Sequence, residues 1–445
     1  MRIVSNVVVL AGVLCGAVGC SGAEIDPFVS GGDDVADEGA GSATHDDSAS
    51  GDDTGDAVGD PGAEGPDDEG GVDDGGDETQ GGADDGGPDL PDLDCDPQPL
   101  WYLPKDPLVT EPLQLRQWRW IAVPEMRCAN DTTGGFFVNS SEQSRDLVVF
   151  FGGGGVCYDP ISCALDTPLL LGMGPAPLET WLADLQSHSG IFDRFDPGNP
   201  FRDASYVFFP HCTGDGHTAD KITMYVSGAP IQQVGYRNVQ EGMRIIAPTF
   251  EHVERVTVAG FSAGGIGSLA NYHQIAWLFE CLGHAPPLLI DDAGPVLRKP
   301  YLSDLAQGSL TAGWGLDDTF GELCPECDSG GYHLALQRIR ELHPGLRSAL
   351  VNAYGDSVVR QLYSALTLDL AFANDANVLR LGLLDYASWT AGLSDPTPAT
   401  RHRQFFYWGE RHGALVVAPL SDTPGLAAFL QAQLDDAPQW SNVHP

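Results

Sequence analysis

Basic residues are scarce in this sequence of 445 residues, which contains 22 Lys and Arg against 63 Asp and Glu. The imbalance is greatest in residues 21–96, which hold 26 acidic residues and no Lys or Arg. Proteins that bind DNA or RNA need a basic surface to neutralise phosphates, so this charge balance excludes nucleic acid as the expected partner. Residues 97–445 carry 37 acidic and 21 basic residues, a balance that a globular domain tolerates.

The N-terminal apolar run is too short to span a membrane, because residues 7–18 supply only about twelve residues after a positive start at Arg2. Such a run is typical of a signal peptide. The small residues before Cys20 resemble the cleavage box of bacterial lipoproteins, in which the cysteine is acylated and becomes the new N-terminus. We expect residues 1–20 to be a signal peptide cleaved before Cys20, and the exported protein to be lipid-anchored to the bacterial cell envelope. The alternative is an ordinary secretory signal and a soluble exported protein.

Residues 21–96 lack side chains that could form a core, since Phe28 is their only aromatic residue. A segment built mainly from Asp, Gly, Glu, Ala and Pro cannot offset the entropy lost on ordering. We expect a disordered, acidic tether that holds a folded domain away from its membrane anchor. A calcium site is the alternative, but no loop here has the spaced ligands and closing Glu of an EF-hand.

Residues 97–445 are long enough to bury about three quarters of their unfolded surface in one core. Short apolar runs rich in β-branched and aromatic residues alternate with helical patterns, which predicts an α/β-hydrolase-like, doubly wound fold with a mainly parallel sheet and helices on both faces. The predicted strands are 147–151, 205–209, 256–261, 288–291, 349–353 and 404–408, with antiparallel strands near 117–123 and 135–138. The predicted helices are 238–246, 264–281, 333–342, 357–368 and 426–434.

Eight cysteines follow Cys20. An even number of cysteines in an exported protein favours disulfide bonds. The alternative is a zinc site at Cys324 and Cys327 with His333 nearby, although a single CxxC is a weak metal signature. We expect neither a metal nor an organic cofactor.

The motif G-x-S-x-G occurs once, at residues 260–264, between a predicted strand and a predicted helix. In this context Ser262 is expected on a tight turn that lifts its hydroxyl clear of the sheet, as the nucleophile of an α/β-hydrolase is. The helix N-terminus beneath it favours developing negative charge. The alternative is a glycine-rich turn that merely packs a helix against a strand.

A serine nucleophile needs a base and an acid, which in α/β-hydrolases follow it along the chain in loops after later strands. His412 follows the last predicted strand and is the best base. Asp356 follows the preceding strand and is the best acid, while Asp291 and Asp292, one strand earlier, compete with it. The alternative role of these two is to brace loops through backbone hydrogen bonds.

Four consecutive glycines, residues 152–155, follow the strand 147–151, where lipases and esterases carry a loop whose backbone amides bind the oxyanion. The amide of Ala263 is expected to be the other donor. Phosphate binding is the alternative use of such a loop, but the Lys-Ser/Thr ending of a P-loop is missing.

These segments together resemble the pectin acetylesterase family, which also contains the Notum-type carboxylesterases. Four segments follow the family's order and are similar to its Gly-Gly-Gly-Trp-Cys, Tyr-Cys-x-Gly-Asp, Ser-Ala-Gly-Gly and Asp-Ala-Gly motifs: residues 153–157, 211–216, 262–265 and 292–294. Residues 351–354 before Asp356 and the loop at His412 complete the order. The sequence departs from the pattern at Val156, where Trp is usual, and at Gly355, an additional residue before the acid.

The resemblance implies a serine carboxylesterase whose catalytic residues are Ser262 as nucleophile, His412 as base and Asp356 as orienting acid. The oxyanion donors that it implies are the amides of Gly155, Val156 and Ala263. It also implies disulfides between Cys157 and Cys163 and between Cys128 and Cys212.

The expected reaction is ester hydrolysis through an acyl-enzyme, with acetyl groups on a polysaccharide such as pectin as the expected substrate and a monomer as the expected state. One alternative is a longer acyl ester on a lipid or an acylated protein. Another is a surface binding protein that kept the fold and lost turnover. Trp181, Tyr225 and Tyr236 are candidates for a sugar groove, and the core is their alternative place.

Overall fold

The computed structural model describes residues 95, 99, 101–108, 115–165, 175–187, 189–225 and 230–445. The predicted signal peptide and its lipidation site Cys20 lie outside the described residues, as does the predicted tether apart from Cys95. No described helix has both the length and the apolar content needed to cross a bilayer.

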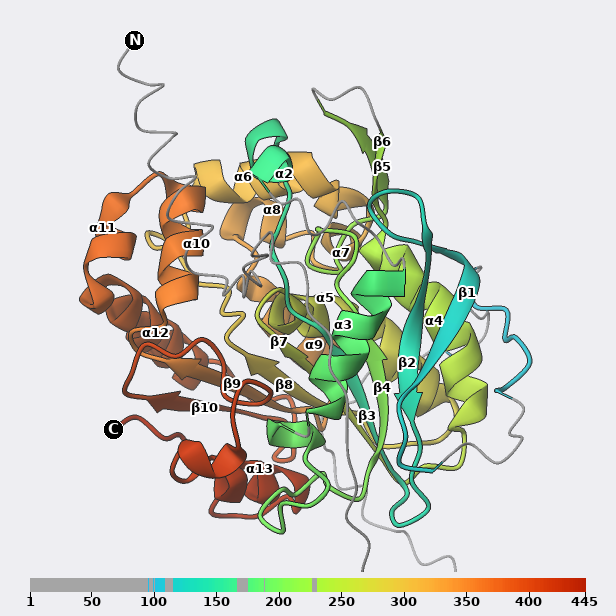
Figure 1. Cartoon of the computed structure of the whole chain (residues 1–445). Coiled ribbons are helices and arrows are strands. Elements are labelled where there is room, and N and C mark those ends of the chain that lie inside the picture. The colour runs from blue at the N-terminus through green and yellow to red at the C-terminus, as the bar shows by residue number, and fades with distance from the viewer. Residues whose placement is uncertain are drawn as a thin grey trace, which may run out of the picture. The chain divides into compact units, whose positions relative to one another are not determined.

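The described domain is organised around one eight-stranded sheet with the strand order β1-β2-β4-β3-β7-β8-β9-β10 (Figure 1). Its first two neighbour pairs, β1 with β2 and β2 with β4, are antiparallel, and all later pairs are parallel. The strands are β1 (Arg119–Arg127), β2 (Thr133–Asn139), β3 (Asp146–Phe151), β4 (Ser205–Phe209), β7 (Arg255–Phe261), β8 (Leu288–Asp292), β9 (Arg347–Ala353) and β10 (Arg401–Tyr407). A separate two-stranded ribbon pairs β5 (Lys221–Met224) with β6 (Pro230–Gln233).

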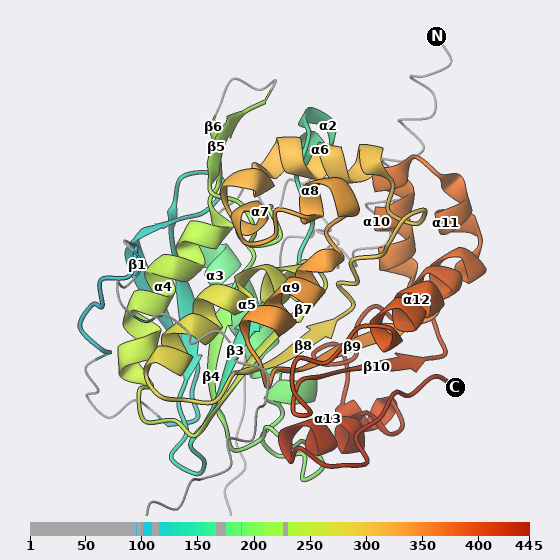
Figure 2. The same ribbon diagram turned by 180° about the vertical axis from the view of Figure 1, so that it is seen from behind.

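Helices cover both faces of this sheet. The helices are α2 (Pro160–Leu165), α3 (Pro175–Gln186), α4 (Gly235–Thr249), α5 (Ala263–Cys281), α6 (Asp304–Trp314), α7 (Phe320–Leu323), α8 (Cys327–Gly330), α9 (Leu334–Leu342), α10 (Ser357–Thr367), α11 (Leu370–Asn374), α12 (Ala376–Ala391) and α13 (Leu426–Leu434). Figure 1 shows α3 and α13 in front of the sheet, and the reverse view in Figure 2 shows α4, α5 and α9 over the opposite face. The predicted doubly wound α/β fold is therefore confirmed.

The core has two layers because successive side chains of a strand point to opposite faces. In β3, Leu147, Val149 and Phe151 join the cluster under α4, α5 and α9. Val148 and Phe150 join the other cluster, under α3 and α13. All five side chains are fully buried, which explains why the strand reads as a continuous apolar run rather than an alternating one.

All eight cysteines after Cys20 form disulfide bonds. The pairs are Cys95–Cys281, Cys128–Cys212, Cys157–Cys163 and Cys324–Cys327. The second and third pairs are the two that the family resemblance implies. The fourth pair leaves no thiolate at the CxxC motif, so the alternative of zinc at Cys324 and Cys327 does not fit this structure.

The topology gathers the predicted site residues at one edge of the sheet. In parallel strands the carboxyl ends share an edge, and ligands of open α/β sheets bind there. Residues 152–157 follow β3, Ser262 follows β7, and Asp292 ends β8. Asp356 and His412 follow β9 and β10.

Candidate active site

Ser262 occupies a strained turn between β7 and α5. Its backbone has φ of 59° and ψ of −122°, a conformation that a residue with a side chain adopts only when its surroundings impose it. The glycines of the motif explain how the turn forms. A Cβ on Gly260 would lie 1.9 Å from the carbonyl oxygen of Gly264, and a Cβ on Gly264 would lie 2.0 Å from that of Phe151. Both positions therefore require glycine, as the motif G-x-S-x-G has it.

Two backbone hydrogen bonds anchor this turn. The Ser262 amide donates to the Asp292 carbonyl at 2.7 Å, and the Gly265 amide donates to the Ser262 carbonyl at 2.8 Å. The end of β8 therefore supports the turn from the side of the neighbouring strand. This fixes the position of Ser262 relative to the sheet edge.

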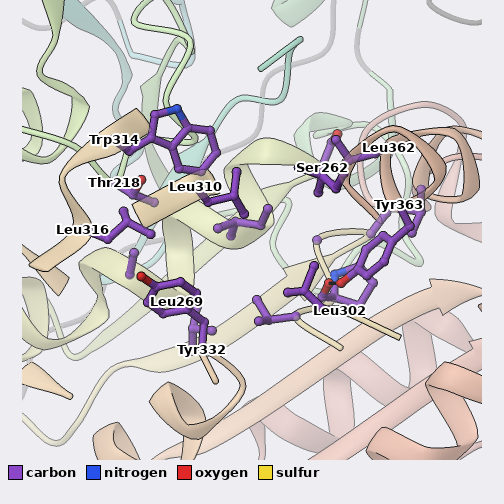
Figure 3. A pocket seen from close by; sticks show the side chains of 18 of the residues that line it. Thr218, Ser262, Leu269, Leu302, Leu310, Trp314, Leu316, Tyr332, Leu362 and Tyr363 are labelled. Carbon is purple, nitrogen blue, oxygen red and sulfur yellow. Dashed lines mark hydrogen bonds between the residues drawn. The ribbon is translucent and has the colours of Figure 1, made fainter. Parts of the chain in front are cut away.

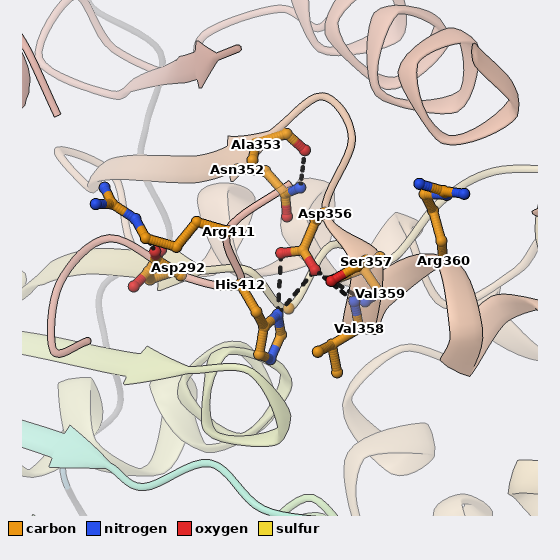
Figure 4. A network of polar contacts seen from close by, with 12 residues as sticks. Asp292, Asn352, Ala353, Asp356, Ser357, Val358, Val359, Arg360, Arg411 and His412 are labelled. Atoms are coloured by element: carbon orange, nitrogen blue, oxygen red, sulfur yellow. Dashed lines mark hydrogen bonds and ion pairs between the residues drawn. The ribbon is translucent and has the colours of Figure 1, made fainter. Parts of the chain in front are cut away.

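His412 and Asp356 form a hydrogen-bonded pair (Figure 4). The two Asp356 carboxylate oxygens lie 3.0 and 2.9 Å from His412 Nδ1. Since a carboxylate only accepts, Nδ1 carries the proton and the neutral ring keeps Nε2 free as a base. The Asp356 side chain is fully buried, and that of His412 is 17% exposed.

Asp356 also caps helix α10. Its Oδ1 accepts from the amides of Val358 and Val359, each at 3.0 Å. Figure 4 shows the carboxylate between the His412 ring and the first turn of α10. The helix start thus fixes the orientation of the acid, and the acid fixes the orientation of the ring.

Asp292, the competing acid, binds backbone amides. Its carboxylate accepts from Ala414 at 2.8 and 3.0 Å and from Leu415 at 2.7 Å. Burial raises the pKa of Asp292 to about 6, and these amide donors partly oppose the shift. Asp292 therefore ties down the chain just after His412, which is the loop-bracing role that the sequence left open for it.

Asp291, the other competitor, points behind the turn. Its Oδ1 accepts from the Gly294 amide at 2.8 Å. Burial raises the pKa of Asp291 to about 8, with a smaller opposing effect from that amide. Of the three candidate acids, only Asp356 has a hydrogen bond to His412 among the described contacts.

The loop of residues 152–157, which we call the glycine loop, lies against Ser262. A Cβ on Gly153 would lie 2.7 Å from the Phe261 carbonyl oxygen and 2.9 Å from Ser262 Cβ. The Gly152 amide donates to Phe209 and the Cys157 amide to Gly214. These bonds fix the two ends of the loop. The predicted oxyanion donors Gly155 and Val156 lie between the fixed ends.

Ala263, the third predicted donor, is the first residue of α5 and is buried. The first amides of a helix have no partner within it. The Ala263 amide thus follows the nucleophile directly, at the positive end of the helix dipole. The start of α5 also lies close to the glycine loop, since a Cβ on Gly264 would lie 2.7 Å from the Gly152 carbonyl oxygen.

An apolar cavity opens at Ser262 (Figure 3). Its volume is about 80 Å³. Ser262, Leu362 and Tyr363 lie at one end in Figure 3, and Trp314 and Leu316 lie at the other. The lining residues, almost all apolar, are Thr218, Ser262, Ile266, Leu269, Ala270, Ala293, Gly294, Pro295, Val296, Leu302, Leu310, Trp314, Leu316, Phe320, Tyr332, Val358, Val359, Leu362, Tyr363, Leu366 and His412.

The sequence did not identify the walls of this cavity. The candidates for a groove, Trp181, Tyr225 and Tyr236, are not among its lining residues. Trp181 packs on the core cluster of α3 and α13 instead. Val156, at the position where the family usually has Trp, packs against the other cluster. The aromatic walls come from residues 314–332 and from α10, segments outside the motifs that carry the family resemblance.

The described residues contain no group of three or more His, Cys, Asp or Glu side chains arranged to hold a metal ion. The groups at the cavity that can do chemistry include the Ser262 hydroxyl, the His412 imidazole with its carboxylate partner, and backbone amides. Acyl transfer through a serine nucleophile uses groups of these kinds.

Comparison with known proteins shows what the chain is similar to. Residues 121–299 match the family described as Pectinacetylesterase. The palmitoleoyl-protein carboxylesterase notum1 of Xenopus laevis is 28% identical over 195 residues, which is 43% of this chain and 35% of that protein. The palmitoleoyl-protein carboxylesterase NOTUM of Homo sapiens is 26% identical over 200 residues, which is 43% of this chain and 34% of that protein. The matched region thus spans about a third of the length of these relatives.

A solved structure has the same fold. The structure of the Wnt deacylase Notum from Drosophila aligns with a TM-score of 0.52 and 16% identity, covering 74% of this chain and 96% of the other. An identity of 16% supports similarity of the fold only. Together these matches confirm the predicted resemblance to the pectin acetylesterase family, including its Notum-type carboxylesterases.

Proposed function

We propose that this protein is an exported serine carboxylesterase that hydrolyses acyl esters through an acyl-enzyme formed on Ser262. One observation carries the proposal. Ser262, held in a strained turn, lines the same apolar cavity as His412, and His412 is paired with the buried Asp356. The names of the relatives, all carboxylesterases, support the same reaction class.

In the proposed reaction the Ser262 Oγ attacks the ester carbonyl carbon and His412 Nε2 takes the hydroxyl proton. The carbonyl electrons move onto oxygen, and the amides of Gly155, Val156 and Ala263 bind the resulting oxyanion. When the carbonyl re-forms, the C–O bond to the alcohol breaks and the alcohol takes the proton from His412. A water then repeats both steps on the acyl-enzyme, releasing the carboxylic acid and restoring the Ser262 hydroxyl.

The cavity sets the length of the acyl group. The volume of about 80 Å³ is several times the roughly 10–15 Å³ that a cavity needs to hold one water. An acetyl methyl would fill only part of it. The geometry therefore favours an acyl chain of medium length over the acetyl ester of a polysaccharide that we expected from the sequence.

Burial of each further methylene is worth about 0.8 kcal/mol, or about fourfold in kcat/KM. We expect kcat/KM to rise about fourfold per methylene from acetyl esters to hexanoyl or octanoyl esters. Beyond that length the cavity is full, and dodecanoyl and hexadecanoyl esters should gain nothing more.

The test is hydrolysis of p-nitrophenyl esters of these chain lengths by the expressed protein and by Ser262→Ala. The variant should lose at least about a thousandfold in kcat/KM. Ser309→Ala, which removes a serine hydroxyl from α6 outside the cavity lining, is the matched control and should keep full activity. A fluorophosphonate should label the wild type on Ser262 and leave Ser262→Ala unlabelled. Hydrolysis that survives in Ser262→Ala would refute the mechanism.

Absence of Ser262-dependent turnover across the whole series would favour the alternative of a binding protein with this fold. If kcat/KM is instead highest for the acetate ester, the substrate is an acetyl ester, as we expected from the sequence. In that case acetylated polysaccharides would be the next substrates to test.

The N-terminal sequence supports export. We propose that residues 1–20 direct export and that Cys20 carries the lipid anchor, with residues 21–96 as a tether. Detergent phase partition tests the anchor: the protein made in a bacterial host should enter the detergent phase, and Cys20→Ala should stay in the aqueous phase. Equal partition of both proteins would leave the ordinary secretory signal as the correct interpretation.

A further inference from the structure

Behind the glycine loop lies a second loop, residues 211–218, which follows β4. Its first residue, His211, is only 2% exposed. His211 Nε2 accepts from the Gly216 amide at 2.8 Å, so the ring is held within its own loop. The sequence resembles the family here, but a tyrosine usually stands where this chain has His211.

The hydrogen bond to Gly216 fixes the tautomer of His211. Because Nε2 accepts, the proton of the neutral ring is on Nδ1. Burial and the neighbouring His217 ring hold the pKa of His211 well below its ordinary value, which keeps the ring neutral. Within the described part of the chain, Nδ1 has no hydrogen-bond partner.

The Nδ1 edge of His211 faces the glycine loop. A Cβ on Gly154 would lie 3.0 Å from His211 Nδ1, and the next nearest atoms, also of His211, are 3.7 Å away. The His211 ring is therefore the nearest group on that side of Gly154 among the described residues. This contact lies in the stretch between the two fixed ends of the loop, directly before the predicted oxyanion donors Gly155 and Val156.

A second buried histidine supports the same loop. His217 Nε2 lies 3.0 Å from the Gly152 carbonyl oxygen, and since a carbonyl only accepts, Nε2 carries the proton. The rings of His211 and His217 lie side by side, with centroids 4.8 Å apart. Burial lowers the pKa of His217 to about 4, so this ring is also neutral near pH 7.

The loop of residues 211–218 is itself held rigidly. Asp215 accepts from the Thr213 hydroxyl and from the amides of His217 and Gly235, at 2.7 to 2.9 Å. A disulfide joins Cys212 to Cys128. The two rings therefore meet the glycine loop from a fixed base.

We propose that His211 is a positioning residue for ester hydrolysis: it supports the glycine loop at Gly154, so that the following amides point at the oxyanion. This inference rests on the proposed function. Misplacing reacting or stabilising groups by about 1 Å costs about a hundredfold, and losing one oxyanion donor costs a hundredfold to a thousandfold. We expect His211→Ala to lower kcat by tenfold to a hundredfold with little change in KM.

The decisive experiment is a double-mutant cycle between His211 and Gly154. In the wild type, Gly154→Ala places its methyl 3.0 Å from Nδ1, so the ring or the loop has to give by a few tenths of an ångström. Because the ring is held by its hydrogen bond with the Gly216 amide, we expect the loop to move and kcat to fall at least tenfold. In the His211→Ala background the ring is gone, and the same substitution should cost less than threefold. Additive losses in kcat would overturn the inference, because they would mean that the two residues act independently.

A transition-state analogue separates positioning from general structural damage. A trifluoromethyl ketone of the preferred chain length forms a tetrahedral adduct on the serine, so its inhibition constant should rise in His211→Ala by the same factor as kcat falls. His211→Gln retains an acceptor for the Gly216 amide and should recover part of kcat. If His211→Ala does not fold, the double-mutant cycle is carried out with His211→Gln and Gly154→Ala instead. Additive losses in kcat in that cycle would likewise overturn the inference.

His402→Ala is the matched control, since His402, near the start of β10, is also buried but hydrogen bonds to Ser348 of β9. It should lower thermal stability without lowering kcat. If wild-type turnover depends on Ser262 but His211→Ala keeps kcat, the inference fails and the proposed function stands. If no turnover depends on Ser262, both fail.

Discussion

Replacing Asp291 with asparagine is expected to remove a decline in stability at alkaline pH. Asp291 is buried near the Ser262 turn, where its Oδ1 accepts from the Gly294 amide. A Cβ on Gly265 would lie 2.2 Å from the same oxygen, so the carboxyl group packs tightly against the start of α5. Asparagine has the same shape and keeps an oxygen for the Gly294 amide, while it removes the ionisation.

The sign of the effect follows from the two pKa values. Burial raises the pKa of Asp291 to about 8 in the folded protein, and an aspartate in an unfolded chain has a pKa near 3.9. Between these values the folded state binds one more proton than the unfolded state. The free energy of unfolding therefore falls as pH rises, by up to about 1.4 kcal/mol per pH unit, until the folded group ionises too.

Other buried groups obscure this decline below about pH 7. Burial raises the pKa values of Asp292 and Asp215 to about 6, which adds a decline at lower pH. Burial lowers the pKa of His217 to about 4 and that of His402 to about 3, which acts in the opposite direction up to about pH 6.5. Above pH 7 each of these groups has the same charge in both states. Asp291 then contributes a fall of about 1.4 kcal/mol between pH 7 and 9.

Guanidinium unfolding followed by tryptophan fluorescence, with the disulfides intact, measures this difference. The wild type should lose about 1.4 kcal/mol more than Asp291→Asn between pH 7 and 9. Burial also raises the pKa values of several tyrosines, which adds a smaller decline near pH 9 that both proteins share. Asp106→Asn, at an exposed position, should leave the wild-type slope unchanged. Parallel curves for the wild type and Asp291→Asn would refute the reasoning, because they would show that Asp291 has the same charge in both states.

Three further predictions concern the cavity, the acid and the tether. Leu316→Trp should shorten the cavity at the end away from Ser262, lowering kcat/KM for octanoyl esters about fourfold per excluded methylene; an equal loss on acetyl esters would contradict this. Asp356→Asn should lower kcat by about 10⁴-fold at pH 7 because it keeps the helix cap but no longer favours the protonated ring, and an equal loss in Asp292→Asn would argue against this assignment. Deletion of residues 24–94 should leave the kinetics on soluble esters unchanged, and a change of more than threefold would show that the tether affects the domain.

The strands and the Ser262 turn could be predicted because local sequence determines both. Residues 147–151 are apolar throughout, and both faces of β3 are indeed buried. The turn needs glycine at positions 260 and 264 because backbone oxygens lie within 2.0 Å of where a Cβ would be. A motif that arises from close backbone contact keeps the same spacing wherever the turn occurs, which is why it can be read without a structure.

The cavity could not be predicted, because its walls come from segments whose structure depends on tertiary contacts. Helix α6 contains Gly308 and Gly313, and glycine lowers helix propensity by about 1 kcal/mol. Gly313 is required by packing, since a Cβ there would lie 2.2 Å from the Tyr158 carbonyl oxygen. Trp314 follows directly, and its indole nitrogen donates to the Cys157 carbonyl at 2.9 Å. Partners about 150 residues away leave no local pattern in the sequence.

Strand positions in the sequence also could not decide which aspartate pairs with His412. Asp292 and Asp356 lie at or just beyond the carboxyl ends of neighbouring parallel strands, so strand position alone cannot separate them. Their hydrogen-bond partners distinguish the two residues. Asp292 accepts from the Ala414 and Leu415 amides, and Asp356 pairs with the His412 ring. One carboxylate thus holds the chain beyond His412, the proposed base, and the other holds the His412 ring itself. Loss of the first should displace the loop, with effects on both kcat and stability, whereas loss of the second should remove proton transfer while the loop stays in place.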